Sequence, residues 1–179
     1  MPLRDDRNIY LIGPRASGKT TLGRRLAQAL DRPFVDLDAV FLERQGESIA
    51  DLVTREGWDA FRRAEAAILA DVAGTPGQVI GTGGGAVLMP ENRNILAQGL
   101  VFYLQASPER LAERLLADMN EAQRPKLTDL GLKEEIMATL AEREPLYLAC
   151  AHAVLPERPL EELLDYAKQA LALFEKKGS

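Results

Sequence analysis

Near its start the chain reads Gly13-Pro14-Arg15-Ala16-Ser17-Gly18-Lys19-Thr20. This segment matches the phosphate-binding pattern G-x-x-x-x-G-K-[ST] at every fixed position. The apolar run Ile9–Ile12 directly before it is typical of a buried strand, and residues 19–30 after it carry leucines at helical spacing. A strand, a glycine-rich loop and a helix in this order predict the first unit of an α/β domain built around a parallel sheet.

The rest of the chain continues this alternation of short apolar segments and longer helical patterns. We predict a single domain over residues 1–179, because no repeat, low-complexity run or linker interrupts the pattern. A helical segment, in two stretches, is expected over 39–72. Further strands are predicted at Phe34–Asp38, Val79–Thr82, Leu100–Leu104 and Ala153–Leu155, and further helices at about 108–116, 132–147 and 160–175.

The composition limits the kind of partner. Of the 179 residues, 46% are apolar and 27% are charged, as in ordinary globular domains. The formal net charge of −5 argues against nucleic acid or a membrane surface as a partner, because both require a basic face. A single cysteine, Cys150, permits no internal disulfide. With no signal-peptide pattern and no apolar run near the roughly 18 residues of a membrane span, we expect a cytoplasmic protein.

The glycine-rich loop has the chemistry of a nucleotide site. Its successive backbone N–H groups and the N-terminus of the following helix form a nest for phosphate. Lys19 is expected to reach the β- and γ-phosphates of ATP, and the Thr20 hydroxyl to coordinate Mg²⁺ as a cofactor. The residues predicted to bind the nucleotide in this segment are Gly13, Ala16, Ser17, Gly18, Lys19, Thr20 and Thr21.

Two carboxylates follow on the second predicted strand. Asp36 and Asp38 are two residues apart, so a strand would place both on one face of the sheet. One could hold the water shell of the metal and the other an acceptor hydroxyl; solvated carboxylates at a strand end are the alternative. A GTPase switch is disfavoured, because the chain has no Asn-Lys-x-Asp tetrad and its D-x-x-G match at 71–74 ends a helical pattern.

Five further motifs follow the phosphate loop in order: Phe34-Val35-Asp36-Leu37-Asp38, Phe61-Arg62-Arg63-Ala64-Glu65, Thr82-Gly83-Gly84-Gly85, Arg124-Pro125 and Glu142-Arg143-Glu144-Pro145-Leu146-Tyr147. Together with the phosphate loop, they make the chain resemble the shikimate kinase family over nearly its whole length. Within that family, the opening Gly13-Pro14-Arg15 and Trp58 are similar to the second of two enterobacterial isozyme types.

The resemblance implies a fold and a reaction. The fold is a three-layer P-loop kinase fold, with a five-stranded parallel sheet flanked by helices. A substrate-binding helical segment lies at about 39–72 and a lid at about 116–130, where the chain is polar and lacks periodicity. The reaction is ATP-dependent phosphorylation of the 3-hydroxyl of shikimate, in the pathway to chorismate and the aromatic amino acids. We expect a monomer whose partners are ATP and shikimate, since nothing in the chain demands another.

The same resemblance assigns roles to single residues. Asp38 matches the carboxylate that binds the acceptor hydroxyls and can act as a base, and Asp36 matches the one tied to Mg²⁺. With Lys19, the catalytic set includes Arg124, which matches a lid arginine that moves onto the ATP phosphates. Arg114 matches an arginine stacked on adenine, a site that the family borders with the segment equivalent to 155–159. The residues matched to shikimate are Arg62 and Arg143, which hold its carboxylate, and Gly83, Gly84 and Gly85, which line it.

Other interpretations of these residues stay open. Arg62 could simply pair with Glu65, three residues further along its helix, and Arg143 could be one more charge on a solvated helix face. The acceptor could be another small hydroxy acid such as gluconate, or a nucleoside monophosphate. The chain could also be a non-catalytic nucleotide-binding regulator, although the intact Lys19 and Asp38 argue against that.

Overall fold

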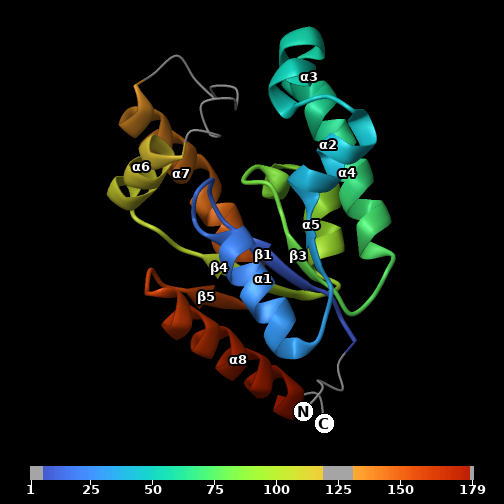
Figure 1. Cartoon of the computed structure of the whole chain (residues 1–179), viewed down its shortest axis with the longest axis vertical. Coiled ribbons are helices and arrows are strands. Elements are labelled where there is room, and N and C mark those ends of the chain that lie inside the picture. Colours follow the sequence, from blue (N-terminus) through green and yellow to red (C-terminus); the bar gives the residue numbers. More distant parts are fainter. Residues whose placement is uncertain (1–5, 119–130, 178–179) are drawn as a thin grey trace.

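A parallel sheet lies at the centre of the molecule. The computed structural model describes residues 6–118 and 131–177, and in these ranges five strands pair in the order β2-β3-β1-β4-β5 (Figure 1). All four neighbouring pairs are parallel, which confirms the five-stranded parallel sheet. The strands are β1 Ile9–Ile12, β2 Phe34–Asp36, β3 Val79–Gly81, β4 Leu100–Leu104 and β5 Ala153–Leu155.

Helices connect and cover the strands. Instead of the two stretches predicted over 39–72 the structure has three helices, because Gly46 (φ 67°) and Gly57 (φ 86°) break the helical backbone. A 3₁₀ turn η1 and helix α5 also form where the sequence predicted neither. None of the helices within the described ranges is long and apolar enough to cross a membrane. The helical elements are α1 Lys19–Leu30, α2 Leu37–Gln45, α3 Ile49–Glu56, α4 Trp58–Ala73, η1 Ala86–Leu88, α5 Pro90–Leu96, α6 Pro108–Ala117, α7 Leu132–Cys150 and α8 Leu160–Lys177.

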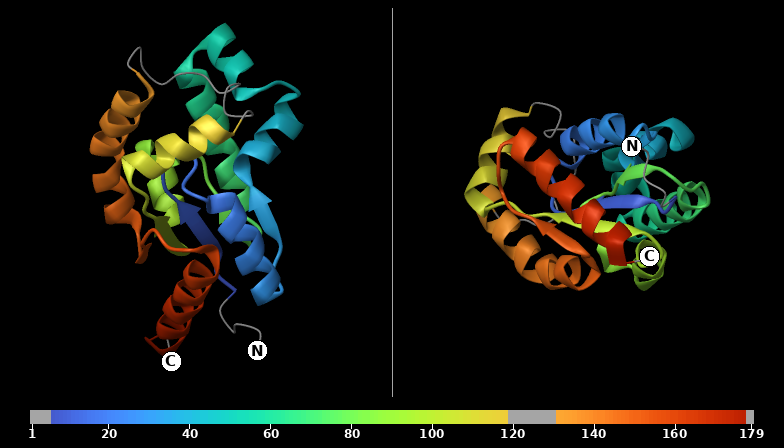
Figure 2. Two further views of the ribbon diagram at one scale, coloured as in Figure 1. Left: turned by 60° about the vertical axis from the view of Figure 1, so that its left-hand side comes forward. Right: turned by 90° about the horizontal axis from the view of Figure 1, so that it is seen from below.

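The central strand β1 shows why there are three layers. Successive side chains of a strand point to opposite faces. Ile9 and Leu11 therefore pack in the core beneath α1 and α8, whereas Tyr10 and Ile12 pack against α2–α5 and α7. Figures 1 and 2 show the sheet between these two groups of helices. Since helices cover both faces, β1 is a continuous apolar run rather than an alternating one.

The second strand is shorter than predicted, and this corrects the geometry expected for its carboxylates. β2 ends at Asp36, whose side-chain Oδ1 accepts a hydrogen bond of 3.0 Å from the backbone N–H of Asp38 and so caps α2. Asp38 consequently lies in the first turn of a helix and not on a strand. The two carboxylates still lie at one site, because both line the same cavity.

A buried amide fixes the start of β1 against the turn before β3. The Asn8 side chain donates to the carbonyl oxygens of Ala73 (3.2 Å) and Thr75 (3.0 Å) and accepts from the N–H of Gln78 (2.9 Å). Only 6% of Asn8 is exposed, so no water replaces these partners if they are lost. The amide thus ties together the segments that enter the two central strands.

We expect Asn8→Asp to lower the free energy of unfolding by about 1–3 kcal/mol at pH 7, because a carboxylate would face two buried carbonyl oxygens. The loss should shrink at a pH low enough to protonate the new carboxyl group. Urea denaturation measures both effects. The control Asn94→Asp makes the same change at an exposed position of α5 and should stay within about 0.5 kcal/mol of the parent; equal losses in both variants would contradict the prediction.

Candidate active site

The phosphate loop joins β1 to α1 at the carboxyl end of the sheet, where ligands bind in open α/β folds. Two of its glycines have backbone angles that other residues rarely adopt: φ is 144° at Gly13 and 96° at Gly18. A Cβ atom on Gly13 would also lie only 2.7 Å from the backbone oxygen of Leu104 at the end of β4. Gly13 therefore shapes the turn, and the residues after it face the ligand space.

Lys19 occupies the interior of this loop. Its Nζ donates to the backbone oxygens of Gly13 (2.8 Å) and Pro14 (2.6 Å) and contacts the Ser17 hydroxyl at 3.4 Å. The ammonium group is thus held among loop atoms at the mouth of the phosphate nest. The predicted contact of Lys19 with the β- and γ-phosphates stays a prediction.

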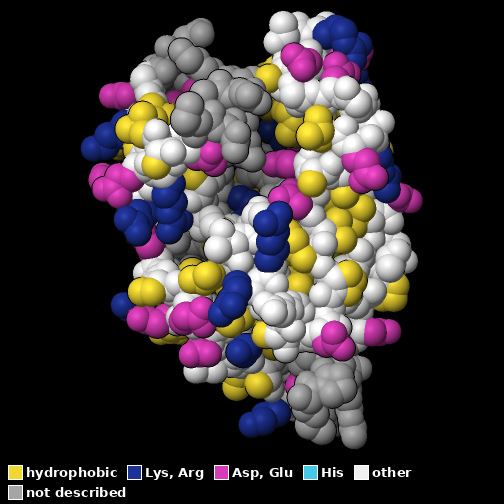
Figure 3. All heavy atoms as spheres, in the orientation of Figure 1, with side chains coloured by type: hydrophobic (Ala, Val, Ile, Leu, Met, Phe, Trp, Pro, Cys, Tyr) yellow, Lys and Arg dark blue, Asp and Glu magenta, His cyan; other side chains and the backbone are white. Residues whose placement is uncertain are grey.

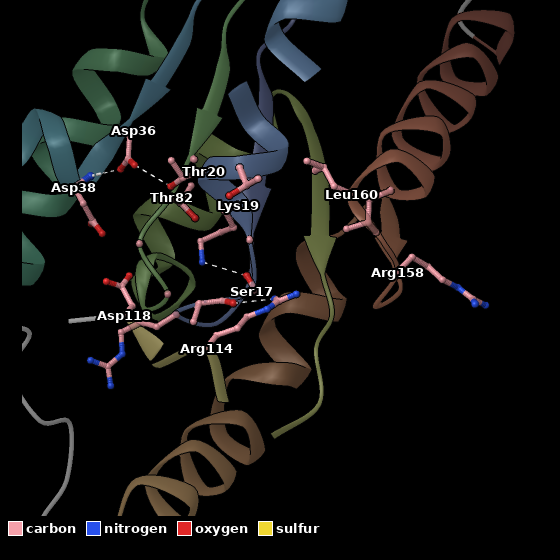
Figure 4. Close-up of a pocket in the computed structure, with 18 residues that line it drawn as sticks. Ser17, Lys19, Thr20, Asp36, Asp38, Thr82, Arg114, Asp118, Arg158 and Leu160 are labelled. Carbon is pink, nitrogen blue, oxygen red and sulfur yellow. Dashed lines mark hydrogen bonds between the residues drawn. The ribbon is translucent and has the colours of Figure 1, made fainter. Parts of the chain in front are cut away.

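A cleft of about 510 Å³ opens beside the loop and appears as a hollow in the space-filling view (Figure 3). Figure 4 shows its walls: Thr20 and Asp36 lie near the loop, while Arg158 comes from the segment between β5 and α8 and Leu160 is the first residue of α8. Of the predicted nucleotide-binding residues that the structure describes, all but Gly13 line the cleft. Lining residues not predicted are Arg15, Gly81, Thr82, Asp118, Arg158, Leu160 and Leu163.

Arg114 lies on the nucleotide side, at the end of α6. Its guanidinium donates to the backbone oxygen of Ala16 in the phosphate loop at 2.9 Å. This contact places the arginine in the wall of the cleft, while its stacking on adenine stays a prediction. The remaining predicted cleft residue, Arg124, lies outside the described residues, as does the segment 119–130 of the predicted lid.

The metal ligands predicted from the sequence lie together. The Thr20 hydroxyl donates to Oδ2 of Asp36 at 3.0 Å, and both residues line the cleft. Oxygen ligands of this kind suit Mg²⁺, which usually takes one or two protein ligands and completes its shell with phosphate and water. In the described ranges no three His, Cys, Asp or Glu residues cluster as an all-protein metal site. The pair fits a magnesium ion bound together with a nucleotide.

A second, smaller pocket shares part of the cleft wall. Asp38 and Arg15 line both cavities, so they mark the passage from one to the other. The predicted acceptor residues are all present in this pocket. Its wall consists of Arg15, Asp38, Ile49, Trp58, Phe61, Arg62, Glu65, Gly83, Gly84, Gly85 and Arg143.

Arg62 pairs with Glu65, which confirms the ion-pair alternative, and it also faces the pocket, while its contact with a substrate carboxylate stays a prediction. The ion pair measures 2.7 Å, and only 13% of the Arg62 side chain and 4% of the Glu65 side chain are exposed. The guanidinium lies 5.4 Å from the Trp58 ring centre and 5.1 Å from that of Phe61. Aromatic rings and a carboxylate thus hold the arginine in one orientation.

The glycine run has a packing reason that the sequence did not reveal. A Cβ atom on Gly85 would collide with the Arg62 guanidinium, and one on Gly83 would collide with the Glu65 carboxylate. These glycines make room for the ion pair against the backbone, in addition to any approach of a ligand. The charged groups of the pocket consequently lie directly on the main chain at the end of β3.

Arg143 is a buried cation, so the alternative of a solvated helix charge is wrong. It is 6% exposed, lies on α7, and its Nε has no hydrogen-bond partner in the part of the chain that the structure describes. Oε1 of Glu65 is buried without a partner in the same sense. Burial raises the pKa of Glu65, although the positive charges of Arg62 and Arg143 oppose the rise. Unsatisfied polar atoms of this kind point to a polar ligand in the pocket.

Two α7 contacts connect this pocket to the phosphate loop. Arg15 donates to Oε1 of Glu135, in the first turns of α7, at 2.9 Å, and both side chains are largely shielded from water. Tyr147, one turn after Arg143, donates to the backbone oxygen of Gly84. The sequence predicted neither contact, because each joins segments that are far apart in the chain.

This site defines the class of protein: a P-loop kinase whose acceptor pocket suits a small anion. The sequence model of the shikimate kinase family matches residues 15–172, and the chain belongs to that family. The predicted activity, ATP-dependent phosphorylation of shikimate, is thereby confirmed at the level of the family.

Individual relatives agree with this assignment. Shikimate kinase 2 of Yersinia enterocolitica is 46% identical over 166 residues, which cover 92% of this chain and 95% of that protein. A solved structure of shikimate kinase from Acinetobacter baumannii in complex with shikimate has a TM-score of 0.85 and 33% identity, covering 96% of this chain and 94% of that one. A gluconokinase from Sinorhizobium meliloti covers 97% of this chain and 96% of its own with a TM-score of 0.58 and 18% identity, a likeness of fold alone.

The raised pKa of Glu65 predicts a pH dependence of stability. A carboxyl group whose pKa rises on folding stabilises the folded state fully below its unfolded pKa, and that contribution is lost as pH rises through the folded pKa. The quantity to compare is the free energy of unfolding of the parent minus that of Glu65→Gln. We expect this difference to fall as pH increases from about 4, the unfolded pKa of a glutamate. Urea denaturation at a series of pH values measures this slope.

Glu56→Gln, at an exposed position of α3, is the control and should show no such slope. Glu65→Gln also loses the ion pair with Arg62. This loss shifts the difference in free energy of unfolding at every pH but does not change the sign of its slope. A parent that gains stability over Glu65→Gln as pH rises would contradict the prediction.

Proposed function

We propose that the chain transfers the γ-phosphoryl group of ATP to the 3-hydroxyl of shikimate, and that Asp38 receives this hydroxyl. One observation carries the proposal: Asp38 belongs to the walls of both cavities, between the phosphate loop and the two buried arginines. An acceptor with a carboxylate at the arginines and a hydroxyl at Asp38 would meet the phosphate at this junction. Such positioning is the main source of catalysis in phosphoryl transfer.

The acceptor side recognises a carboxylate and hydroxyl groups. Arg62 and Arg143 present planar donors that suit a carboxylate, and Nε of Arg143 is a buried donor with no described partner. Asp38 accepts hydrogen bonds from the hydroxyls and can take the proton of the one that attacks. Gly83, Gly84 and Gly85 bring the main chain to the ligand.

The nucleotide side holds ATP and its metal. In this proposal Ala16, Ser17, Gly18, Lys19 and Thr21 surround the phosphates, with Gly13 shaping the loop. Thr20 and Asp36 would hold Mg²⁺, which neutralises charge on the transferring phosphoryl group. Arg114 lies beside the base. The new oxygen–phosphorus bond forms as the bond between the β- and γ-phosphates breaks, and ADP leaves with the bridging oxygen.

We further propose that Arg124 brings positive charge onto the phosphates from a lid over 116–130, and that the enzyme is a cytoplasmic monomer. A coupled assay for ADP release, with shikimate, gluconate and AMP offered separately, tests the choice of acceptor. Turnover with shikimate alone is the expected result. A rate with gluconate or AMP equal to that with shikimate would reject the proposal.

The acceptor assignment predicts that Arg62→Ala and Arg143→Ala each weaken shikimate binding about ten- to a hundredfold. A lost charge-assisted hydrogen bond costs about 1.5–3 kcal/mol. ATP affinity should change little, because neither arginine lines the nucleotide cleft. Isothermal titration with each ligand measures both affinities. Arg63→Ala, the exposed neighbour on α4, is the control and should bind shikimate like the parent. If ATP affinity fell as much as shikimate affinity, the arginines would belong to the nucleotide site, and the acceptor assignment would be wrong.

The catalytic assignment predicts that Lys19→Ala and Asp38→Asn each lower kcat at least a hundredfold, the scale for a group that acts in the transition state. Asp59→Asn removes the same charge from the first turn of α4, as Asp38→Asn does from α2, and it controls for the loss of a helix-terminal carboxylate. Steady-state rates and melting temperatures are compared. A near-normal kcat in Asp38→Asn would show that the Asp38 carboxylate has no catalytic role.

A further inference from the structure

Tyr147 is a fully buried residue on α7 whose hydroxyl the proposed mechanism does not use. It donates a hydrogen bond to the backbone oxygen of Gly84, in the middle of the glycine run. Arg143 lies four residues before it on the same helix, so both side chains leave the same face of α7. One helix face therefore carries an arginine of the acceptor pocket and a side chain that donates to Gly84.

Gly84 lies where the two cavities meet. It lines both of them, and a Cβ atom at this position would lie 3.3 Å from the backbone nitrogen of Arg15 and 3.6 Å from the oxygen of Gly13. The peptide that Tyr147 holds is thus packed against the phosphate loop on its other side. A rotation of this peptide would change the walls of both cavities. The change would be larger in the acceptor pocket, because Gly85 also lines it.

The Tyr147 ring is itself fixed. It stacks on Tyr103 of β4 with ring centres 5.0 Å apart and planes 25° from parallel. The Tyr103 hydroxyl donates to Oε1 of Glu144 at 3.1 Å, away from the glycine run. Burial raises the pKa of Tyr147 to about 12, so its hydroxyl keeps its proton and remains a donor at physiological pH. The two rings supply core packing. The Tyr103 hydroxyl contacts Glu144, whereas the Tyr147 hydroxyl contacts Gly84 and also interacts with the Arg143 side chain, whose charge opposes the rise of its pKa.

We infer that Tyr147 is a positioning residue for the acceptor: its hydroxyl sets the direction of the Gly84–Gly85 peptide and aligns the glycine run with Arg143. Because the peptide is planar and trans, holding the Gly84 carbonyl also directs the N–H of Gly85 the opposite way. That N–H is then a prepared donor for the acceptor. This inference rests on the proposed assignment of the pocket to shikimate.

Packing alone does not explain the hydroxyl. Phenylalanine would fill the same volume and keep the stack with Tyr103, while burying an oxygen costs free energy unless it is hydrogen-bonded. Tyr103 offers a matched comparison within the same pair of rings. Its hydroxyl is also bonded, but to Glu144 rather than to the main chain of the pocket.

The test compares Tyr147→Phe with Tyr103→Phe in the full-length enzyme. Tyr147→Phe should raise KM and Kd for shikimate about tenfold, the effect of about 1.4 kcal/mol, with KM for ATP and kcat changed less than threefold. That split indicates lost acceptor binding rather than lost chemistry. Tyr103→Phe should leave KM for shikimate within twofold. Both variants keep the ring stack and lose a partly buried hydroxyl with its hydrogen bonds, so their melting temperatures should fall by similar amounts.

Hydrogen exchange adds a measurement on the unaltered protein. Shikimate should slow exchange of the Gly85 amide in the parent and in Tyr103→Phe, and should slow it less in Tyr147→Phe. If shikimate does not change the exchange rate of the Gly85 amide in the parent enzyme, the inference is overturned without any substitution. It is also overturned if Tyr147→Phe binds shikimate like the parent, or if the two phenylalanine variants change KM equally. A failure of the acceptor site itself is distinguishable, because Arg62→Ala and Arg143→Ala would then bind shikimate normally.

Discussion

The backbone of Gly13 must pass the carboxyl end of β4 with no room for a side chain, and the arrangement of the site depends on this close approach. It sets the turn that brings the phosphate loop over the sheet, with its carbonyl groups around the Lys19 ammonium. Arg114 then reaches the loop at Ala16, and Gly84 packs against Arg15 from the other side. Nucleotide cleft and acceptor pocket share a wall because both are built against this one turn.

Much of the fold was predictable because its signals are local. β1 and β4 are short runs of apolar residues that need burial on both faces, and they lie where their sequence predicts. Predictions were wrong where the local pattern permits more than one backbone structure. Asp36 continues the pattern of a strand, but its side chain caps a helix, so Asp38 starts a turn instead of extending β2. The breaks at Gly46 and Gly57 depend on positive φ values, which glycine permits but does not require.

The site was predictable to the extent that its motifs carry their own chemistry. The phosphate loop and the two acceptor arginines fall in this category, and the structure brings them together around Asp38. The partners that orient them were not predictable. Glu135 and Tyr147 meet Arg15 and Gly84 across more than sixty residues, and only the tertiary arrangement shows which side chain lies opposite which backbone atom. Arg158 had a weak signal, since the family borders its adenine pocket with the segment equivalent to 155–159.

The ion pair between Arg15 and Glu135 has a thermodynamic consequence for an enzyme with two substrates. It anchors the N-terminal part of α7 to the phosphate loop, and the same helix carries Arg143 into the acceptor pocket seven residues before it ends at Cys150. A nucleotide that draws Arg15 toward its phosphates competes with Glu135 for that guanidinium, and any resulting shift of α7 alters the site of the second ligand. Linkage is reciprocal, so the acceptor must change the affinity for the nucleotide by the same factor. A nucleotide that displaces Glu135 from Arg15 would in this way couple the two cavities through a single helix.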